Sequence, residues 1–469
     1  LLSVEVTAEV GKELSDSGLV GESNAAIYNT GSISREGSVG SNEIYIDADV
    51  ASDIFSSAVN NTGTIEAFAI STNGSTISLV GSGAAINNTG TISANNGASI
   101  SITADELIIG AQGAVETGTF FGRDAGTISV KTGVLNVSSA SVDYNDFDLL
   151  ADVDSKSEAN KLNINISGSS SAMEVSGLST VVASGATING TDAVGETFTV
   201  ASTNAVGVNG IDFSGVTTVV AGTATDIIDI VNAGGDGAQL NGANNELNAS
   251  DITFEEVEKA DLANGTLVGK DDVNEAFSID SDGITVSVNS MSLTSVSAID
   301  AGTSSGDSVT FGVATSASLV AENKITDPGV EELVAIDNSL STTHIDFSNI
   351  NSADLKGGVL TGSDGADTFV VNTGGLKANE IAVTGLALNT DGFATIDAGG
   401  NASGADKLTS DFDATLTGAS KALTSSGFTF QNIETADLNT KALTGSDSAD
   451  TFVLATVDNA TQLKANDIV

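Results

Sequence analysis

The strongest constraint on the fold of this chain is that its sequence repeats. Residues 347–371 read FSNINSADLKGGVLTGSDGADTFVV, and residues 430–454 read FQNIETADLNTKALTGSDSADTFVL, so 16 of 25 positions are identical without a gap. Repetition at a fixed spacing is typical of chains that stack one small structural unit many times. The sequence therefore predicts a repeat architecture, and no single globular core.

A looser form of the same pattern extends the repeat toward the N-terminus. It has an apolar anchor, an aliphatic residue three positions later, and a small residue or an Asp-Leu pair at positions seven and eight. The anchors are Val175, Phe213, Phe254, Phe347 and Phe430. The last two intervals between anchors are each about twice as long as the first two. We therefore predict a period of roughly 40 residues with degenerate units between.

The N-terminal third repeats a different motif. An Asn-Thr-Gly sequence lies within each of the segments 27–33, 59–65 and 86–92, written with Tyr-Asn in the first copy and Asn-Asn in the others. Alternating runs such as 75–79 and 99–103 follow, which predicts half-buried strands joined by turns. A unit of roughly 30 residues is typical of one coil of a parallel β-solenoid. The Asn pairs 60–61 and 87–88 are either stacked amide ladders or ordinary turn residues.

These patterns predict an all-β chain, a parallel β-helix (β-solenoid) forming an elongated rod without obvious caps. We expect a lead-in segment over residues 1–20 and a solenoid with Asn-Thr-Gly repeats over 21–140. An irregular connector over 141–170 would follow, and then a solenoid with Asp/Gly-turn repeats of the longer period over 171–469, cut in mid-repeat.

The composition limits the possible partners. The formal net charge is -47, with 15 Lys plus Arg against 62 Asp plus Glu. Such a field repels phosphate, so nucleic acid and anionic membrane surfaces are not expected as partners and cations are the expected counter-charge. No apolar stretch approaches the roughly 18 residues that a membrane-spanning helix needs, so no membrane insertion is expected. The chain has no Cys, which excludes disulfides and thiolate metal sites.

The acidic turns are the candidate metal sites. Residues 362–370 (GSDGADTFV) resemble the nonapeptide of haemolysin-type (RTX) calcium-binding repeats, with Ser at the second Gly, and 445–453 (GSDSADTFV) is a weaker copy. The resemblance covers about residues 171–469 and implies Ca²⁺ bound by turn carboxylates. Its candidate ligands are Asp364, Asp367, Asp447, Asp450, Asp397, Asp406, Asp192 and Asp271. The alternative is that these Asp residues only satisfy turn geometry, because RTX repeats run in tandem and these motifs do not.

The Asn-Thr-Gly region, about residues 25–140, resembles the filamentous-haemagglutinin-like secreted proteins. This resemblance implies a right-handed parallel β-helix and an extracellular or cell-surface location on a bacterium.

An enzyme is not expected. The arginines are Arg35 and Arg123, far apart in the sequence, and the chain has no Trp for a sugar-stacking cleft. The acidic residues recur with the repeat, whereas a catalytic pair would occur once. We expect a non-enzymatic extracellular structural protein without a small-molecule substrate, which self-associates head to tail into a filament or layer. The alternative is the stalk of a large secreted adhesin or surface-layer protein.

Overall fold

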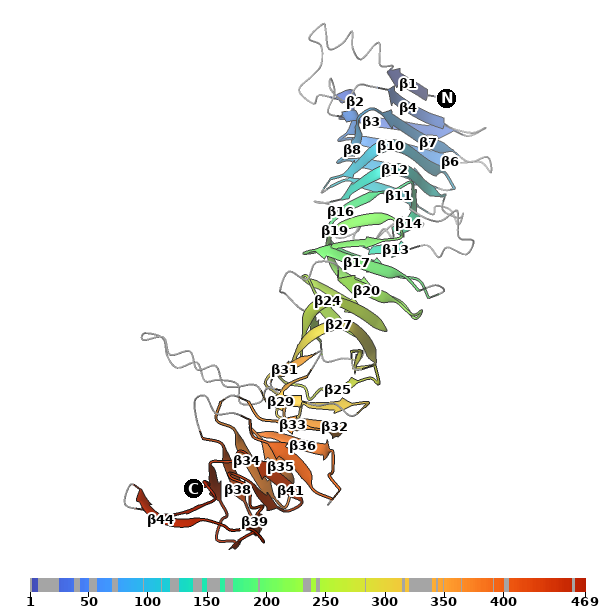
Figure 1. Cartoon of the computed structure of the whole chain (residues 1–469). Coiled ribbons are helices and arrows are strands. Elements are labelled where there is room, and N and C mark those ends of the chain that lie inside the picture. The colour runs from blue at the N-terminus through green and yellow to red at the C-terminus, as the bar shows by residue number, and fades with distance from the viewer. Residues whose placement is uncertain are drawn as a thin grey trace. The chain divides into compact units, whose positions relative to one another are not determined.

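In a computed structural model the chain is all-β (Figure 1). The structure describes residues 2–6, 25–37, 43–49, 57–69, 75–95, 97–110, 112–118, 126–137, 146–149, 161–164, 172–192, 195–230, 238–241, 245–282, 284–313, 317–319, 340–342, 345–348, 350–363, 365–390, 392–399, 405–457 and 460–469. Over these ranges the regular elements are strands, without a helix. The predicted lead-in segment and connector, and the segment with Pro328, lie mostly or wholly outside the described residues.

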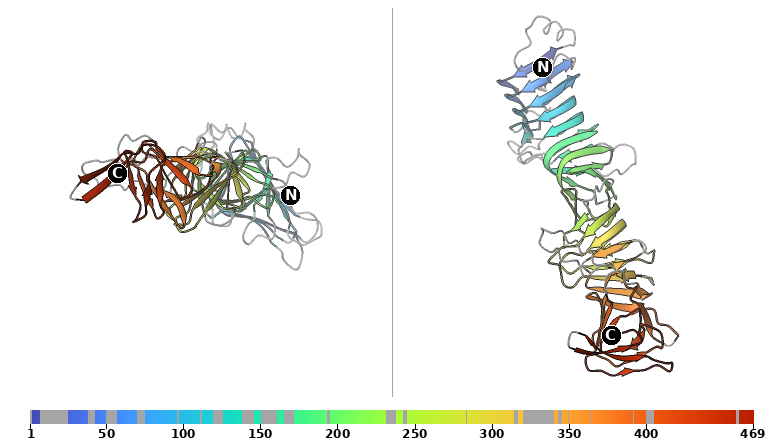
Figure 2. Two further views of the ribbon diagram at one scale, coloured as in Figure 1. Left: turned by 60° about the horizontal axis from the view of Figure 1, so that its bottom comes forward. Right: turned by 60° about the vertical axis from the view of Figure 1, so that its left-hand side comes forward.

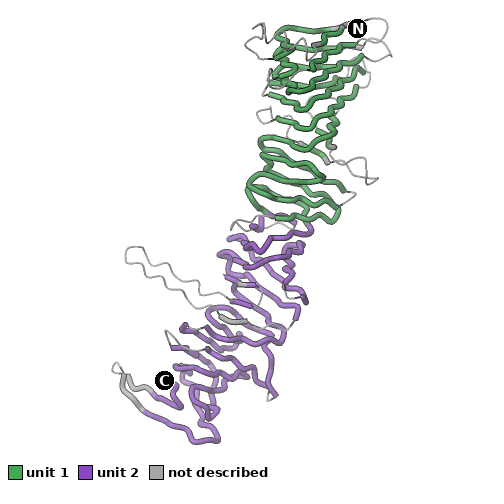
Figure 3. The backbone as a smooth tube through the Cα atoms, turned by 45° about the horizontal axis from the view of Figure 1, so that its top comes forward, with its two compact units in different colours: residues 1–232, 248–257 green, residues 233–247, 258–469 purple. Residues whose placement is uncertain are grey.

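The chain forms two compact units, coloured separately in Figure 3. The first contains residues 1–232 and 248–257, and the second contains 233–247 and 258–469. This division follows spatial contacts, whereas the four sequence segments follow composition and repeat type. The sequence boundaries stay a prediction.

In the N-terminal part of the first unit, three strands recur in the order β2, β3, β4, then β5, β6, β7, then β8, β9, β10. Equivalent strands pair in parallel and lie one above the next in Figure 2. The bounds are β1 Leu2–Val6, β2 Ala25–Asn29, β3 Ser32–Gly37, β4 Glu43–Asp49, β5 Ser57–Asn61, β6 Thr64–Ala69, β7 Thr76–Ser82, β8 Ala85–Asn88, β9 Thr91–Asn95, β10 Ser99–Ile109, β11 Ala114–Gly118 and β12 Ile128–Val137. The Asn-Thr-Gly motif joins the first strand of each trio to the second.

Aliphatic side chains align from strand to strand in this region. Ile44 lies in register with Ile77, Ile77 with Ile100, Ile100 with Ile128, and Ile128 with Met173. All five are at most 2% exposed. Alternation of apolar and polar residues places one face of each strand inside, so the core is a ladder of mostly β-branched side chains.

From residue 146 onward the pairing is mixed. Six three-stranded antiparallel meanders appear among the described residues, and parallel pairs occur beside them. They are β13 Asp146–Leu149, β14 Lys161–Ile164, β15 Met173–Ser176; β17 Thr197–Ser202, β18 Ala205–Val208, β19 Ile211–Val220; β25 Ala276–Ile279, β26 Val286–Val288, β27 Met291–Asp300; β29 Ala317–Leu319, β30 Leu340–Ser341, β31 Asp346–Ser348; β34 Thr368–Asn372, β35 Gly375–Ala378, β36 Ile381–Leu386; and β39 Ala414–Leu416, β40 Leu423–Ser425, β41 Phe428–Gln431. The repeat patterns predict parallel pairing alone, so these antiparallel steps correct that prediction.

The remaining strands link these meanders or lie near the C-terminus. They are β16 Thr180–Asn189, β20 Ile227–Ile230, β21 Ala238–Leu240, β22 Leu247–Ala249, β23 Ile252–Glu255, β24 Lys259–Val268, β28 Ser308–Phe311, β32 Ser352–Gly358, β33 Leu360–Thr361, β37 Ala394–Asp397, β38 Lys407–Ser410, β42 Thr435–Asp437, β43 Leu443–Thr444, β44 Phe452–Val457 and β45 Ala460–Ala465.

The longer repeat period predicted from the anchors corresponds to one meander. Four of the five anchors lie on the third strand of a meander, Val175 on β15, Phe213 on β19, Phe347 on β31 and Phe430 on β41, and Phe254 lies on β23. Two further meanders have their third strand between these anchors, one between Phe254 and Phe347 and one between Phe347 and Phe430. Leu293 on β27 pairs with Val286, and Val383 on β36 pairs with Leu376, so aliphatic residues take the place of the Phe anchor.

Tight two-residue turns connect the second strand to the third in four of these meanders, at residues 209–210, 289–290, 379–380 and 426–427. Asn379 and Glu380 have φ values of 45° and 70°, and Asn209 and Gly210 have 50° and 75° at the equivalent turn. Positive φ at both central residues defines the type I′ hairpin turn, which matches the twist of antiparallel strands. The same conformation returns at residues 250–251, 289–290, 426–427 and 466–467.

Candidate functional site

The acidic turn at residues 362–370 is held together by Asp367. This side chain is 1% exposed. It accepts the backbone N–H of Ser363 at Oδ2 (2.7 Å), and at Oδ1 it accepts the Ser363 hydroxyl (3.1 Å) and Nδ2 of Asn379 (2.6 Å). Its carboxylate therefore fastens the turn to the hairpin of β34 and β35. Asp364 lies outside the described residues.

The copy of this turn has the same contacts. Asp450 accepts the backbone N–H of Ser446 (2.6 Å), the Ser446 hydroxyl (2.9 Å) and Nδ2 of Asn466 (2.6 Å). It is half-buried. Repetition of the complete set of donors shows that the Ser-Asp-Asn combination is a structural element of the repeat, which caps backbone N–H groups.

A second carboxylate lies on the neighbouring strand. Asp406, directly before β38, is fully buried and accepts the backbone N–H of Asp367 at Oδ1 (2.8 Å). The Asp406 backbone N–H donates to Oε2 of Glu434 (2.9 Å), and Glu434 pairs with Lys421 (2.5 Å). Burial raises the pKa of Asp406 to about 6, and the Glu434 and Asp367 carboxylates act in the same direction.

The same relationship occurs at two other places. The backbone N–H of Glu196 donates to Oδ1 of Asp226 (2.6 Å), and that of Glu275 donates to Oδ1 of Asp307 (2.8 Å). All four side chains are at most 5% exposed. Each acidic residue directly precedes a strand, and the two strands of each pair are parallel and in register. We name these three sets, Glu196–Asp226, Glu275–Asp307 and Asp367–Asp406–Glu434, the buried carboxylate ladder.

Sequence reasoning identified only part of this ladder. It proposed Asp367 and Asp406 as site residues and missed Glu196, Asp226, Glu275, Asp307 and Glu434. The missed signal is local: an acidic residue stands two positions before a buried core residue, as in Glu196-Thr197-Phe198 and Glu275-Ala276-Phe277.

The other predicted ligands are not members of the ladder, and they lie in turns or, for Asp397, at the end of β37. Asp192 accepts the backbone N–H and the hydroxyl of Thr223 (both 3.0 Å), and Asp271 accepts the backbone N–H of Thr303 (3.0 Å). Asp397 accepts the backbone N–H of Gly399 (3.1 Å) and Nδ2 of Asn432 (2.6 Å). Asp447 is exposed. Each of these contacts is made by a single carboxylate.

The hydrogen-bond donors around these Asp residues indicate whether the carboxylates are suited to bind Ca²⁺. Ca²⁺ takes six to eight oxygen ligands. Over the described residues, no three His, Cys, Asp or Glu side chains gather where they could hold one ion. The oxygens of Asp367 and Asp450 face N–H and O–H donors, which suits capping and does not suit an inner-sphere cation. The calcium assignment stays a prediction.

The Asn pairs of the N-terminal motif form an amide ladder. Asn29 donates from Nδ2 to Oδ1 of Asn61 (2.7 Å), Asn61 donates to Oδ1 of Asn88 (2.8 Å), and Asn88 donates to the carbonyl oxygen of Ala114 (3.0 Å). Asn61 and Asn88 are at most 1% exposed. The second Asn of each pair thus faces inward, which decides between the two alternatives left open by the sequence.

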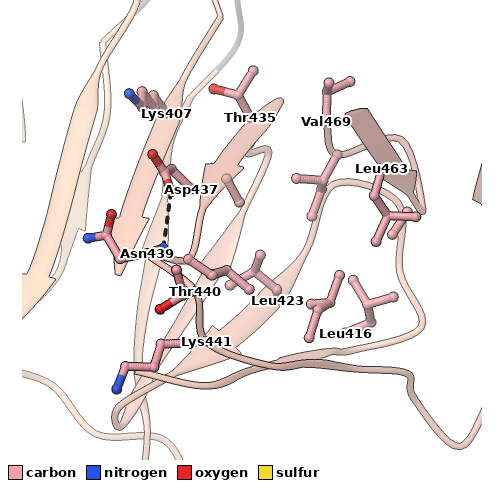
Figure 4. Close-up of a pocket in the computed structure, with 15 residues that line it drawn as sticks. Lys407, Leu416, Leu423, Thr435, Asp437, Asn439, Thr440, Lys441, Leu463 and Val469 are labelled. Carbon is pink, nitrogen blue, oxygen red and sulfur yellow. Dashed lines mark hydrogen bonds between the residues drawn. The ribbon is translucent and has the colours of Figure 1, made fainter. Parts of the chain in front are cut away.

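A cavity of about 890 Å³ lies in the second compact unit near the C-terminus (Figure 4). Its walls include Leu416 and Leu423 from β39 and β40, and Leu463 and Val469 from the last residues. A hydrogen bond from the backbone N–H of Asn439 to Oδ1 of Asp437 (3.0 Å) shapes one edge. None of the buried carboxylates lines the cavity, so the ladder and the cavity are separate features.

Comparisons with known proteins give no relative: no family model, curated protein or solved structure matches this chain. Among the described residues there is no helix of the length and hydropathy needed to cross a membrane.

Proposed function

We propose that this chain is a non-enzymatic structural protein, a repeat-built β-solenoid that supplies length and self-associates in an extracellular or cell-surface filament or layer. The carrying observation is the in-register ladder from β1 through β4, β7, β10 and β12 to β15, in which each strand repeats the pairing of the one before. Each added unit contacts only its neighbours, so such an array extends without needing a larger core.

The proposal includes the finer features expected from the sequence. In this proposal the three-stranded units form a parallel β-helix. The resemblance to filamentous-haemagglutinin-like proteins implies that this helix is right-handed and that the protein is bacterial. The mixed region would be a solenoid in which an antiparallel step is inserted in each period. An elongated rod without caps belongs to the same proposal.

Self-association is supported by three N-terminal strands that pair on one side among the described residues. Among the described strands, β1 pairs only with β4, β2 only with β5, and β3 only with β6. A strand with an unpaired row of N–H and C=O groups accepts another strand. That strand comes from a second copy in the filament proposal, and from further chain in the stalk alternative.

The absence of catalysis is part of the proposal and has its own support. The carboxyl groups whose pKa is raised, those of Glu275, Asp307 and Asp406, are at most 1% exposed and cannot contact a substrate in this conformation. Their repetition along the ladder matches a structural role.

Electron microscopy of the purified chain tests the proposal. Fibres or layers of uniform width that grow with protein concentration are the expected result. Discrete particles of one length at all concentrations would favour the stalk of an adhesin. An added Lys in place of Ser3 or Val4 on the β1 edge should reduce fibre growth, while the same change at the exposed Asp447 should not.

A further inference from the structure

Glu275 and Asp307 form one of the two pairs of the buried carboxylate ladder. Glu275 is 1% exposed and Asp307 is fully buried. Their strands β25 and β28 are parallel and in register, since Ala276 pairs with Ser308. The two residues are therefore aligned on neighbouring strands, and the Asp307 carboxyl group accepts the backbone N–H of Glu275.

Each carboxyl group has one oxygen engaged by the backbone. Oε1 of Glu275 accepts the N–H of Lys270 (3.1 Å), and Oδ1 of Asp307 accepts the N–H of Glu275 (2.8 Å). The other two oxygens, Oε2 of Glu275 and Oδ2 of Asp307, are buried and make no hydrogen bond to a donor. A buried carboxylate oxygen without a donor costs free energy, and two adjacent negative charges add to that cost.

The surrounding charged groups are engaged elsewhere. Nζ of Lys270 donates to the carbonyl oxygen of Asn241 (2.9 Å), and Asp271 and Asp272 are exposed. On the far side of Asp307 the aligned residue is the neutral Asn351, whose Oδ1 accepts the Asp307 N–H (3.1 Å). The charged side chains on the remaining adjoining segments, with their partners, are Glu246 with Asn241 (2.9 Å), Asp280 with Ser287 (3.4 Å), Asp282 with Thr285, and Asp354 with Lys356 (2.5 Å); β26 carries none.

We propose that Glu275 and Asp307 hold one proton between them in the folded protein, which makes the junction of β25 and β28 a pH-sensitive lock. A proton supplies the one donor that the pair lacks, as an O–H of one carboxyl group to an oxygen of the other. A divalent cation would need several further oxygens. Over the described residues no third acidic or imidazole group joins the pair.

The direction of the pH dependence follows from the environment. Burial raises the pKa of both carboxyl groups, and the neighbouring Asp307 raises that of Glu275 further. The folded state then keeps a proton that the unfolded chain releases near pH 4. The free energy that the shared proton contributes to folding is fully present in acid. It is lost as the pH rises and the proton leaves. Stacking in the second compact unit is thus tightest in acidic surroundings.

The test uses urea unfolding of the whole chain at pH 5 and pH 8. Glu275→Gln keeps an oxygen for the Lys270 N–H and adds an N–H donor toward Asp307, so it mimics the protonated pair. We expect its midpoint to exceed that of the native chain at pH 8 and to match it at pH 5. Asp307→Asn should have the same effect. Asp272→Asn, at an exposed position in the same loop, should shift neither midpoint.

Two results would overturn the proposal. One is a Glu275→Gln midpoint below the native value at pH 8, which would show that the ionised pair is the stable form. The other is a native midpoint at pH 8 that rises to the variant's value on addition of CaCl₂ alone, which would assign the pair to a cation. Infrared difference spectra provide a direct readout: at pH 5 the carbonyl stretch of a protonated carboxylic acid should weaken in Glu275→Gln.

Discussion

Asn61 accepts a hydrogen bond from Asn29 and donates one to Asn88, so its side-chain amide links three successive copies of one motif. The carboxylate ladder does the same with backbone N–H groups as donors, as between Asp367 and Asp406. In both, one buried polar side chain is held by its equivalent in the neighbouring repeat. Polar groups thereby fix the register of strands whose aliphatic ladders alone would tolerate a slip by two residues.

Replacement of Asn61 by Ala should break the amide ladder at its centre. The side-chain N–H of Asn29 loses its acceptor, and the side-chain oxygen of Asn88 loses its donor. Each buried group left unsatisfied costs about 1–3 kcal/mol of stability. Thermal melting followed by circular dichroism should show a lower midpoint. Asn87→Ala is the matched control, because Asn87 is the outer residue of its pair. Equal melting of both variants would contradict the ladder.

The Gly of the Asn-Thr-Gly motif is required by the backbone of the preceding copy. A Cβ atom at Gly90 would overlap the carbonyl oxygen of Gly63, whereas one at Gly31 would meet nothing within 4 Å. Gly90→Ala should therefore destabilise the fold by about 1–3 kcal/mol, as overpacking does. Gly31→Ala should change stability by less than about 0.5 kcal/mol. Chemical unfolding of the two variants measures the difference, and equal effects would argue against close stacking here.

The all-β class, the repeat period of the C-terminal part and the degenerate units were predictable because they depend on local alternation and on spacing. The antiparallel steps were not predicted, although Asn209-Gly210 is a strong hairpin signal. The equivalent turns carry Asn289-Ser290, Asn379-Glu380 or Asn466-Asp467, which hide that signal. The local signal of the carboxylate ladder, an acidic residue two positions before a buried core residue, does not show which of these residues pair. The partners lie far apart in the sequence and are brought together by strand register.

The type I′ turn at residues 379–380 should be improved by Gly. Glu380 has a φ of 70°, a conformation that costs an L-residue about 1 kcal/mol and that Gly210 adopts freely at the equivalent turn. Glu380→Gly should raise the unfolding free energy by about 0.5–1 kcal/mol. The control is Glu380→Ala, which removes the same exposed carboxylate and keeps the strain. A stabilisation by Ala as large as that by Gly would assign the effect to charge.

Calcium should stabilise the chain through its surface carboxylates. A net charge of -47 makes the compact state repel itself, and divalent cations reduce this repulsion. We expect millimolar CaCl₂ to raise the melting temperature above that in chelator, and above that in NaCl of equal ionic strength. Identical melting in chelator and in Ca²⁺ would remove calcium from the proposed function. If NaCl of equal ionic strength raises the melting temperature as much, the effect of calcium is general charge screening.

Asp406 should make the folded state less stable as the pH rises. Its pKa is about 6 in the folded protein against an ordinary value of 3.8, so the folded chain binds the proton more tightly than the unfolded chain. Stability is then greatest below about pH 4, falls between about pH 4 and 6, and is level above, with a total loss of about 3 kcal/mol.

Asp406→Asn keeps an oxygen for the Asp367 N–H and removes the titration. The difference in unfolding free energy between this variant and the native chain should therefore grow between pH 4 and 6, in favour of the variant, and then stay constant. Asp447→Asn, at an exposed turn, controls for the change in net charge. A difference that is constant from pH 4 to pH 8 would show that the Asp406 carboxyl group is ionised throughout and that Lys421, through Glu434, offsets its burial.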